Sequence, residues 1–191
     1  MEVEILNPEP TYAKFYNIID KELALKLKNL CKVHGTTANY HGCDALEYKV
    51  PNAYVGNLSR DTVEVLPELH EMIITVQEMA NNIFANTAMS GITTHAGYWI
   101  MQYKVGGCFD AHVDFSTDDE TQSTPALATL VINLSEPEEY EGGKVFLSGK
   151  QVSSEYCGGL LWDGWTEHWS LPTTSGIRSI MVVHFLGLLK Q

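Results

Sequence analysis

The sequence predicts an α+β protein that is mainly β, with helices in its first half and a sandwich or barrel of short strands in its second. Two observations support this class. Apolar residues recur every three or four positions before residue 92 and every second position after it. Clusters of glycine and proline then separate the short apolar segments at regular spacing. At 191 residues the chain is expected to form one domain with a full core.

Two amphipathic helices are predicted in residues 1–90. Asp20 can cap the first, in which Leu23, Leu27, Leu30 and Cys31 fall on one face. The second carries a longer apolar stripe, made of Leu66, Leu69, Met72, Ile73, Val76, Met79, Ala80, Ile83 and Phe84. Both stripes are typical of helices that pack against a sheet. Residues 36–60, between them, are polar and aromatic, and we expect loops that cover the mouth of a site on the substrate side.

The second half, residues 91–191, is expected to form the barrel. In the segment 97–105, Trp99, Met101, Tyr103 and Val105 are expected on one face of a strand, and Gln102 and Lys104 on the other. Further strands are predicted at 127–134, 143–147, 158–163 and 178–185. The residues between them, such as Gly142-Gly143 and Pro172 to Gly176, are typical of turns.

Composition excludes several classes of function. The net charge of −12 argues against a nucleic-acid partner, because binding to phosphates needs clustered lysine and arginine. The four cysteines lack the paired spacing of metal fingers, which favours reduced thiols in a cytoplasmic protein. No apolar segment approaches 18 residues and the N-terminus is acidic, so neither a membrane span nor a signal peptide is expected.

The segment "FDAHVDFSTDDE" at 109–120 contains a candidate metal-binding pair, His112 and Asp114. With seven histidines and 24 acidic residues among 191, about one such His-x-acid pair is expected by chance. On a strand, however, residues two apart project to the same face, so both side chains can bind one ion. The pair therefore needs a third ligand from elsewhere in the chain before it indicates a site.

His168 is the best candidate for that third ligand. Pro172 to Gly176 is expected to form the turn of a hairpin, which would make His168 and Arg178 approximate cross-strand neighbours. Two histidines and one carboxylate on one face of an ion form the arrangement found in non-haem Fe(II) oxygenases. An arginine beside it can hold a carboxylate-bearing co-substrate through two parallel hydrogen bonds.

Taken together, these segments resemble a known family. "YKVGGCFDAHVD", "ATLVINLSEPEEYEGGKVFL" and "GGLLWDGWTEHWSLPTTSGIRSIMVVHF" are similar, in this order, to the Fe(II)- and 2-oxoglutarate-dependent dioxygenases of the prolyl 4-hydroxylase-like branch. The resemblance runs from about Tyr98 to Phe185. It implies a double-stranded β-helix, or jelly-roll barrel, with the N-terminal helices packed against one sheet. Iron would be held by His112, Asp114 and His168, which are also the catalytic residues.

The resemblance also implies a co-substrate pocket. Arg178 would bind the distal carboxylate of 2-oxoglutarate, and Tyr103 sits where the family often places a hydroxyl against it. Thr129 and Asn133 occupy positions that often line this pocket, although ordinary buried polar residues are the alternative. Trp165 and Asp118, from the acidic loop 118–120, are candidates for contact with the substrate. By strand parity His184 shares the face of Arg178, and we expect a buried, hydrogen-bonded histidine there rather than a fourth ligand.

The implied reaction is hydroxylation of an unactivated C–H bond, with O2 as second co-substrate, succinate and CO2 as by-products, and ascorbate as a candidate supporting reductant. A prolyl residue in a protein or peptide is the first choice of substrate. A free amino acid or other small metabolite is the alternative, ahead of nucleic-acid demethylation and of a non-catalytic metal-binding barrel. A cupin-like protein would share the barrel and a metal, but would not need Arg178.

Overall fold

The computed structural model describes residues 1–6, 11–40, 43–51, 60–87, 89, 91–115 and 125–189. Two helices are present, α1 (Lys21–His34) and α2 (Arg60–Ile83). The strands before residue 92 are β1 (Glu2–Leu6), β2 (Tyr12–Tyr16), β3 (Thr36–Tyr40) and β4 (Cys43–Pro51). Those after it are β5 (Ile92–His95), β6 (Gly97–Tyr103), β7 (Phe109–His112), β8 (Ala126–Asn133), β9 (Tyr140–Gly142), β10 (Val145–Leu147), β11 (Lys150–Val152), β12 (Gly159–Asp163), β13 (His168–Ser170), β14 (Thr173–Gly176) and β15 (Arg178–Gly187).

The strands form three antiparallel sheets. The largest has nine strands in the order β1-β2-β12-β8-β15-β6-β4-β3, with β5 also paired to β15. A four-stranded sheet has the order β11-β10-β13-β7, and β14 pairs with β9 alone. The protein is therefore α+β and mainly β, as predicted. None of these sheets closes on itself within the residues that the structure describes.

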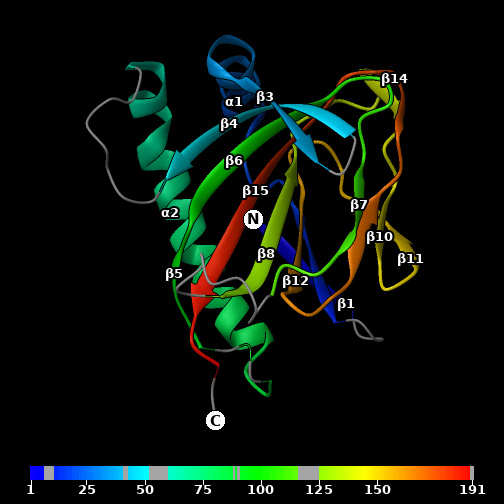
Figure 1. Ribbon diagram of the computed structural model, residues 1–191. Coiled ribbons are helices and arrows are strands. Elements are labelled where there is room, and N and C mark those ends of the chain that lie inside the picture. Colours follow the sequence, from blue (N-terminus) through cyan, green and yellow to red (C-terminus); the bar gives the residue numbers. More distant parts are fainter. Residues whose placement is uncertain are drawn as a thin grey trace.

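The nine-stranded sheet is the central layer of the molecule. One of its faces packs with both helices into the largest apolar core, which contains Leu27, Val76, Leu130 and Phe185. Its other face faces the four-stranded sheet, whose Leu147 packs with Trp162 of β12. Figure 1 shows α2 on the left of the large sheet, α1 at the top of the view, and β7, β10 and β11 on the right. A sheet buried on both faces explains why β8 reads as the nearly continuous apolar segment "ALATLVIN".

The helices form where the sequence predicts them. The side chain of Asp20 accepts a hydrogen bond from the backbone N–H of Leu23 at 2.8 Å and so caps α1. The predicted stripe of α1 is buried, and so are the members of the α2 stripe from Leu69 onward, apart from Met79 and Ile83, which are partly buried. The side chain of Leu66 lies outside the described residues. The burial of both stripes against the sheet confirms the expected packing.

The N-terminal half differs from the prediction in its strands. Residues 1–90 are less helical than expected, because β1 and β2 extend one edge of the large sheet and β3 and β4 extend the other. The expectation of a loop at 36–60 is wrong for Thr36–Tyr40 and Cys43–Pro51, which pair with each other in a hairpin, and β4 also pairs with β6. The second partner of β4, β6, lies about 50 residues further along the chain, beyond the reach of a local pattern.

Two further expectations concern the thiols and the membrane. Cys31 and Cys157 are buried free thiols, but Cys108 takes part in a disulfide bond, so the expectation of reduced cysteines is wrong at that position. Within the described part of the chain, neither helix combines the length and the apolar character that crossing a membrane requires.

Candidate metal centre

His112, Asp114 and His168 meet between the two larger sheets. His112 ends β7 and His168 begins β13, and the two residues are direct partners in the register of these strands. Their rings lie 4.1 Å apart, centre to centre. β7 ends at His112, and Asp114 lies two residues beyond it, so the two residues do not share one face of a strand as expected. Their side chains nevertheless lie close together.

The three side chains offer their ligand atoms toward a common point. Asp114 Oδ1 lies 3.4 Å from His112 Nε2, and Asp114 Oδ2 lies 3.5 Å from His168 Nε2. One ligand atom from each residue can be chosen so that all lie within 4.8 Å of one another. Metal–ligand bonds to nitrogen and oxygen are about 2.0–2.2 Å long, so one ion between these atoms can reach them with small side-chain adjustments.

A hydrogen bond at Nδ1 orients each of the two histidine rings so that its Nε2 faces Asp114. His112 Nδ1 lies 2.8 Å from the carbonyl oxygen of Asp110, and His168 Nδ1 lies 2.9 Å from that of Thr166. A carbonyl oxygen only accepts, so each Nδ1 carries the hydrogen and donates it. Each Nε2 therefore keeps its lone pair for a metal ion, as in the outer hydrogen bonds typical of metal-binding histidines.

The pKa shifts of Asp114 and His168 suit a bound cation, whereas that of His112 reflects the anionic oxygens beside it. Burial alone raises the pKa of Asp114, but the hydrogen bond with His112, the nearby His184 and His168 and the Thr129 hydroxyl together hold that pKa well below its usual range. Burial lowers the pKa of His168. Burial also acts to lower the pKa of His112, but the Asp114 and Asp110 oxygens outweigh it and the pKa is raised. A carboxylate with two imidazoles on one face of an ion fits Fe(II) and leaves positions open for other ligands.

Two polar residues of the large sheet contact Asp114. The Thr129 hydroxyl lies 2.5 Å from Asp114 Oδ2, and the same hydroxyl oxygen lies 3.0 Å from His184 Nδ1. Thr129 and His184 are direct register partners on β8 and β15, in the middle of the sheet. The sequence predicted a hydrogen-bonded His184, but it did not predict this link to the carboxylate.

Arg178 is a buried cation on the same face of the large sheet. It is 6% exposed, and its guanidinium carbon lies 5.6 Å from the ring centre of Tyr103, its register partner on β6. Among the residues that the structure describes, no carboxylate forms an ion pair with it. Glu47 lies on the same face, on β4, but pairs with Lys49 at 3.1 Å. A buried guanidinium without an anion is costly, so this position favours a negatively charged ligand.

The backbone leaves room for Arg178 at Gly143. A Cβ atom at this glycine would lie 2.5 Å from Arg178 Cδ and 3.5 Å from the hydroxyl oxygen of Thr173. Gly143 also has a φ of +59°, which favours glycine. The Thr173 hydroxyl is buried, and within the described part of the chain it has no hydrogen-bond partner. The sequence identified Gly143 only as a turn residue, and Thr173 only as the middle of a turn.

The hairpin expected between His168 and Arg178 is not present. Thr173–Gly176 is itself a strand, β14, which pairs with β9. His168 on β13 is opposite His112 and Leu147, whereas Arg178 on β15 is opposite Tyr103. The expectation of cross-strand neighbours is therefore wrong, and the two residues belong to different sheets.

The remaining predicted residues are placed as follows. The Tyr103 hydroxyl donates to Met101 Sδ at 3.4 Å, and burial raises the pKa of Tyr103 to about 12 although the charge of Arg178 acts to lower it. The Asn133 amide bonds at both ends, to the carbonyl of Ser154 and the N–H of Ser135. Trp165 is 54% exposed and stacks on Phe115, the residue after Asp114, at 4.2 Å. Asp118 and the rest of the acidic loop lie outside the described residues.

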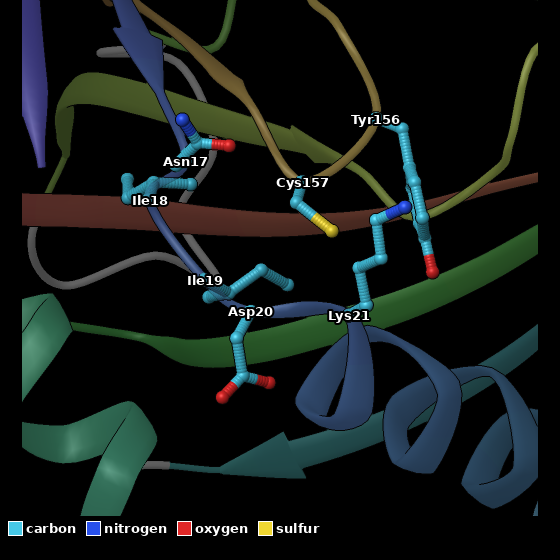
Figure 2. Close-up of a pocket in the computed structure, with 7 residues that line it drawn as sticks. All are labelled: Asn17, Ile18, Ile19, Asp20, Lys21, Tyr156 and Cys157. Carbon is cyan, nitrogen blue, oxygen red and sulfur yellow. The ribbon is translucent and has the colours of Figure 1, made fainter.

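A separate pocket of about 360 Å³ lies on the helical side of the large sheet. Figure 2 shows its lining, in which the Lys21 side chain runs beside the Tyr156 ring and Cys157 lies between these two residues and the segment 17–20. Burial raises the pKa of the Cys157 thiol, which makes it a weak nucleophile. Asp20, in the same lining, is engaged in capping α1. The pocket therefore lacks an activated group, and the metal centre remains the candidate functional site.

Comparison with solved structures identifies the fold. A viral collagen prolyl hydroxylase from Paramecium Bursaria Chlorella virus-1, solved as a 2OG complex, matches with a TM-score of 0.67 and 18% identity over 93% of this chain and 96% of that one. A Pseudomonas putida prolyl-4-hydroxylase matches with a TM-score of 0.66 and 12% identity over 92% of both chains. This protein has the prolyl hydroxylase fold. The resemblance inferred from the sequence is thus confirmed at the level of the fold.

Two further matches agree with this result. A Trichoplax adhaerens prolyl hydroxylase, in complex with a hypoxia inducible factor oxygen degradation domain peptide fragment, gives a TM-score of 0.70 at 12% identity over 92% of this chain and 83% of that one. A Burkholderia pseudomallei member of the 2OG-Fe(II) oxygenase family gives 0.62 at 13% identity, over 99% of this chain and 88% of that one. No protein-family model matches the chain, and no curated protein matches its sequence.

Proposed function

We propose that this protein is an Fe(II)- and 2-oxoglutarate-dependent dioxygenase whose metal is held by His112, Asp114 and His168. The observation that carries the proposal is the convergence of these three side chains, together with a buried arginine on the same face of the large sheet as Thr129 and His184 that pairs with no described carboxylate. A metal-binding barrel that takes no carboxylate co-substrate would not require a buried arginine at position 178. The prolyl hydroxylase fold supports the same chemistry.

The proposal includes the architecture. We propose that the nine-stranded and four-stranded sheets form the two walls of a double-stranded β-helix, with the metal between them. The chain would be a single domain over residues 1–191, because β1 and β2 from its start and β15 from its end belong to one sheet.

In this proposal the protein binds and orients the co-substrate, while the iron, when bound, supplies the coupled oxidation of 2-oxoglutarate and substrate by O2. Arg178 forms a bidentate ion pair with the distal carboxylate, whose negative charge compensates the buried guanidinium. The ring of Tyr103 forms a wall beside it. Thr129 and Asn133 contribute to the wall of the same pocket, although their polar atoms bond within the protein.

The proposed substrate is a prolyl residue in a protein or peptide. The exposed ring of Trp165, which stacks on the buried ring of Phe115 beside Asp114, offers an apolar surface that suits the flat face of a pyrrolidine ring. The Trichoplax adhaerens hydroxylase was solved with a peptide fragment, and its fold is shared. A free amino acid or other small metabolite is the second candidate, since it could pack against the same aromatic ring.

The test measures succinate formed from 2-oxoglutarate in the presence of Fe(II) and O2. The wild type should form succinate, and more of it with proline-containing peptides, whose mass should increase by one oxygen atom. The His112→Ala variant should form none above the protein-free control. A wild type that forms no succinate with any peptide or amino acid, although it binds Fe(II), would contradict the proposed activity.

A further inference from the structure

The hydrogen bonds around Thr129 have one consistent set of donors and acceptors. An ionised carboxylate such as that of Asp114 has no hydrogen to donate, so it only accepts. Thr129 has a single O–H, and it donates this hydrogen to Asp114 Oδ2. The contact between the Thr129 oxygen and His184 Nδ1 at 3.0 Å must then be a bond that the histidine donates. The result is a chain in which His184 donates to Thr129 and Thr129 donates to Asp114.

This chain argues against His184 as a fourth metal ligand through its near nitrogen. Nδ1 lies 3.9 Å from Asp114 Oδ2, close enough to suggest such a role. A nitrogen that carries hydrogen toward Thr129, however, has no lone pair for a metal. The edge of the Trp99 ring packs against the imidazole at 4.8 Å between ring centres, which holds the ring in this orientation.

The chain also joins the two walls of the site. Asp114 follows β7, an edge strand of the four-stranded sheet. Thr129 and His184 lie opposite each other on β8 and β15, two central strands of the large sheet, whose backbones are paired on both sides. The carboxylate at the end of an edge strand is therefore held by the most extensively paired part of the fold.

We propose that His184 is a positioning residue, which acts through Thr129 to hold Asp114 Oδ2 and so leaves Oδ1 as the single oxygen offered to the metal. The inference rests on the proposed metal site. His184 orients the Thr129 hydroxyl by occupying its acceptor side, so that its one hydrogen is directed at the carboxylate. Loss of such an outer partner typically weakens metal binding by about 10- to 100-fold, because the ligand is no longer preoriented.

The test is Mn(II) affinity, measured by the EPR signal of free Mn(II) in titrations of the protein without 2-oxoglutarate. His184→Leu and Thr129→Val each break the chain and should weaken binding by about 10- to 100-fold. His184→Asn places an amide N–H near the position of Nδ1, and Thr129→Ser keeps the hydroxyl, so both should stay within about threefold of the wild type. The double variant T129V/H184L should bind no more weakly than Thr129→Val alone, because the chain is already broken by the first change.

Controls separate positioning from folding and from direct ligation. His70→Leu, at an exposed position of α2, should bind Mn(II) as the wild type does. Thermal unfolding of each variant without metal reports its fold. An unchanged affinity in folded His184→Leu would overturn the inference, as would additive losses in T129V/H184L. A loss in His184→Asn as complete as that in His112→Ala would also overturn it and make His184 a ligand. A wild type that binds no Mn(II) and no Fe(II) would instead contradict the proposed function.

Discussion

Arg178 and Tyr103 are register partners on β15 and β6, and the guanidinium carbon of Arg178 lies 5.6 Å from the centre of the Tyr103 ring. Both side chains are almost fully buried. The aromatic face stabilises the cation to a limited extent, by about 0.5–2 kcal/mol, which is less than the cost of removing a charge from water. The positive charge of Arg178 is therefore compensated only when an anion binds beside it.

Replacing Arg178 with alanine should leave Fe(II) binding intact and weaken 2-oxoglutarate binding by about 30-fold or more. Removal of one partner from a partly desolvated, charge-assisted pair typically costs about 2–5 kcal/mol. Arg178→Lys should recover part of the affinity, since it restores the charge without the planar fork. The dissociation constant is measured by anaerobic titration of the Fe(II)-loaded protein with 2-oxoglutarate, following the metal-to-ligand charge-transfer band.

The matched control for Arg178 is Lys144→Ala, which removes an exposed cation from the same domain. Its effect should be small, because a solvent-exposed charge is screened by water and salt. Equal dissociation constants for the wild type and a folded Arg178→Ala variant would remove the co-substrate site from the proposal.

The metal ligands were predictable because two local patterns are sufficient for them. The two-residue spacing of His112 and Asp114 indicates the pair, although the strand itself ends at His112, and the order of the motifs indicates His168. The reason expected for the position of His168 was nevertheless wrong, since it faces His112 through the β13–β7 pairing and not Arg178 through a hairpin. Turn residues at 172–176 predict a change of direction, but they do not reveal that Thr173–Gly176 pairs with the distant β9.

The limits of the fold prediction have a similar cause. Periodicity was sufficient for β6, β8 and β15, because their core-facing residues alternate or form long apolar segments. It was insufficient for β3 and β4, where Thr36, Asn39 and Glu47 interrupt the alternation. These strands are stabilised by pairing with each other and with β6, a tertiary interaction that local propensity does not report. The link from His184 to Asp114 through Thr129 was missed for the same reason.

The metal site itself is tested with His112→Ala. The wild type, reconstituted without oxygen, should bind one Fe(II) per chain, and the variant should lose tight binding because a three-ligand site cannot spare one ligand. His70→Ala, an exposed histidine of α2, serves as the control for the loss of any imidazole. Metal analysis after desalting measures the content. Equal iron in His112→Ala and the wild type would refute the assignment of this ligand.

Trp165 is predicted to contact the substrate and not the co-substrate. Trp165→Ala should raise the Michaelis constant for the peptide by about tenfold, since a lost aromatic contact of this size costs about 1–2 kcal/mol. Turnover of 2-oxoglutarate without peptide should be unchanged. The control is Trp169→Ala. The Trp169 ring stacks on Phe146 of the neighbouring strand, so its removal should lower stability and leave the Michaelis constant for the peptide unchanged. A parallel decrease of both activities in Trp165→Ala would identify a structural role.

The last prediction compares two glycines that differ only in what surrounds them. Gly143 and Gly149 have φ values of +59° and +81°, so alanine at either position should cost about 1–2 kcal/mol of stability through backbone strain. A Cβ at Gly149 would meet nothing within 4 Å, whereas one at Gly143 would lie 2.5 Å from Arg178 Cδ. Arg178 must then shift its aliphatic stem, and its guanidinium moves with it.

Gly143→Ala should therefore weaken 2-oxoglutarate binding by about tenfold or more, while Gly149→Ala lowers the unfolding temperature and leaves that affinity unchanged. Iron content should match the wild type in both variants, because neither glycine contacts a metal ligand. Thermal unfolding and the anaerobic titration used for Arg178 provide the two measurements. If both variants lost stability equally and both kept full affinity, the placement of the guanidinium would not control co-substrate binding, and Arg178 would be a structural cation stabilised by Tyr103.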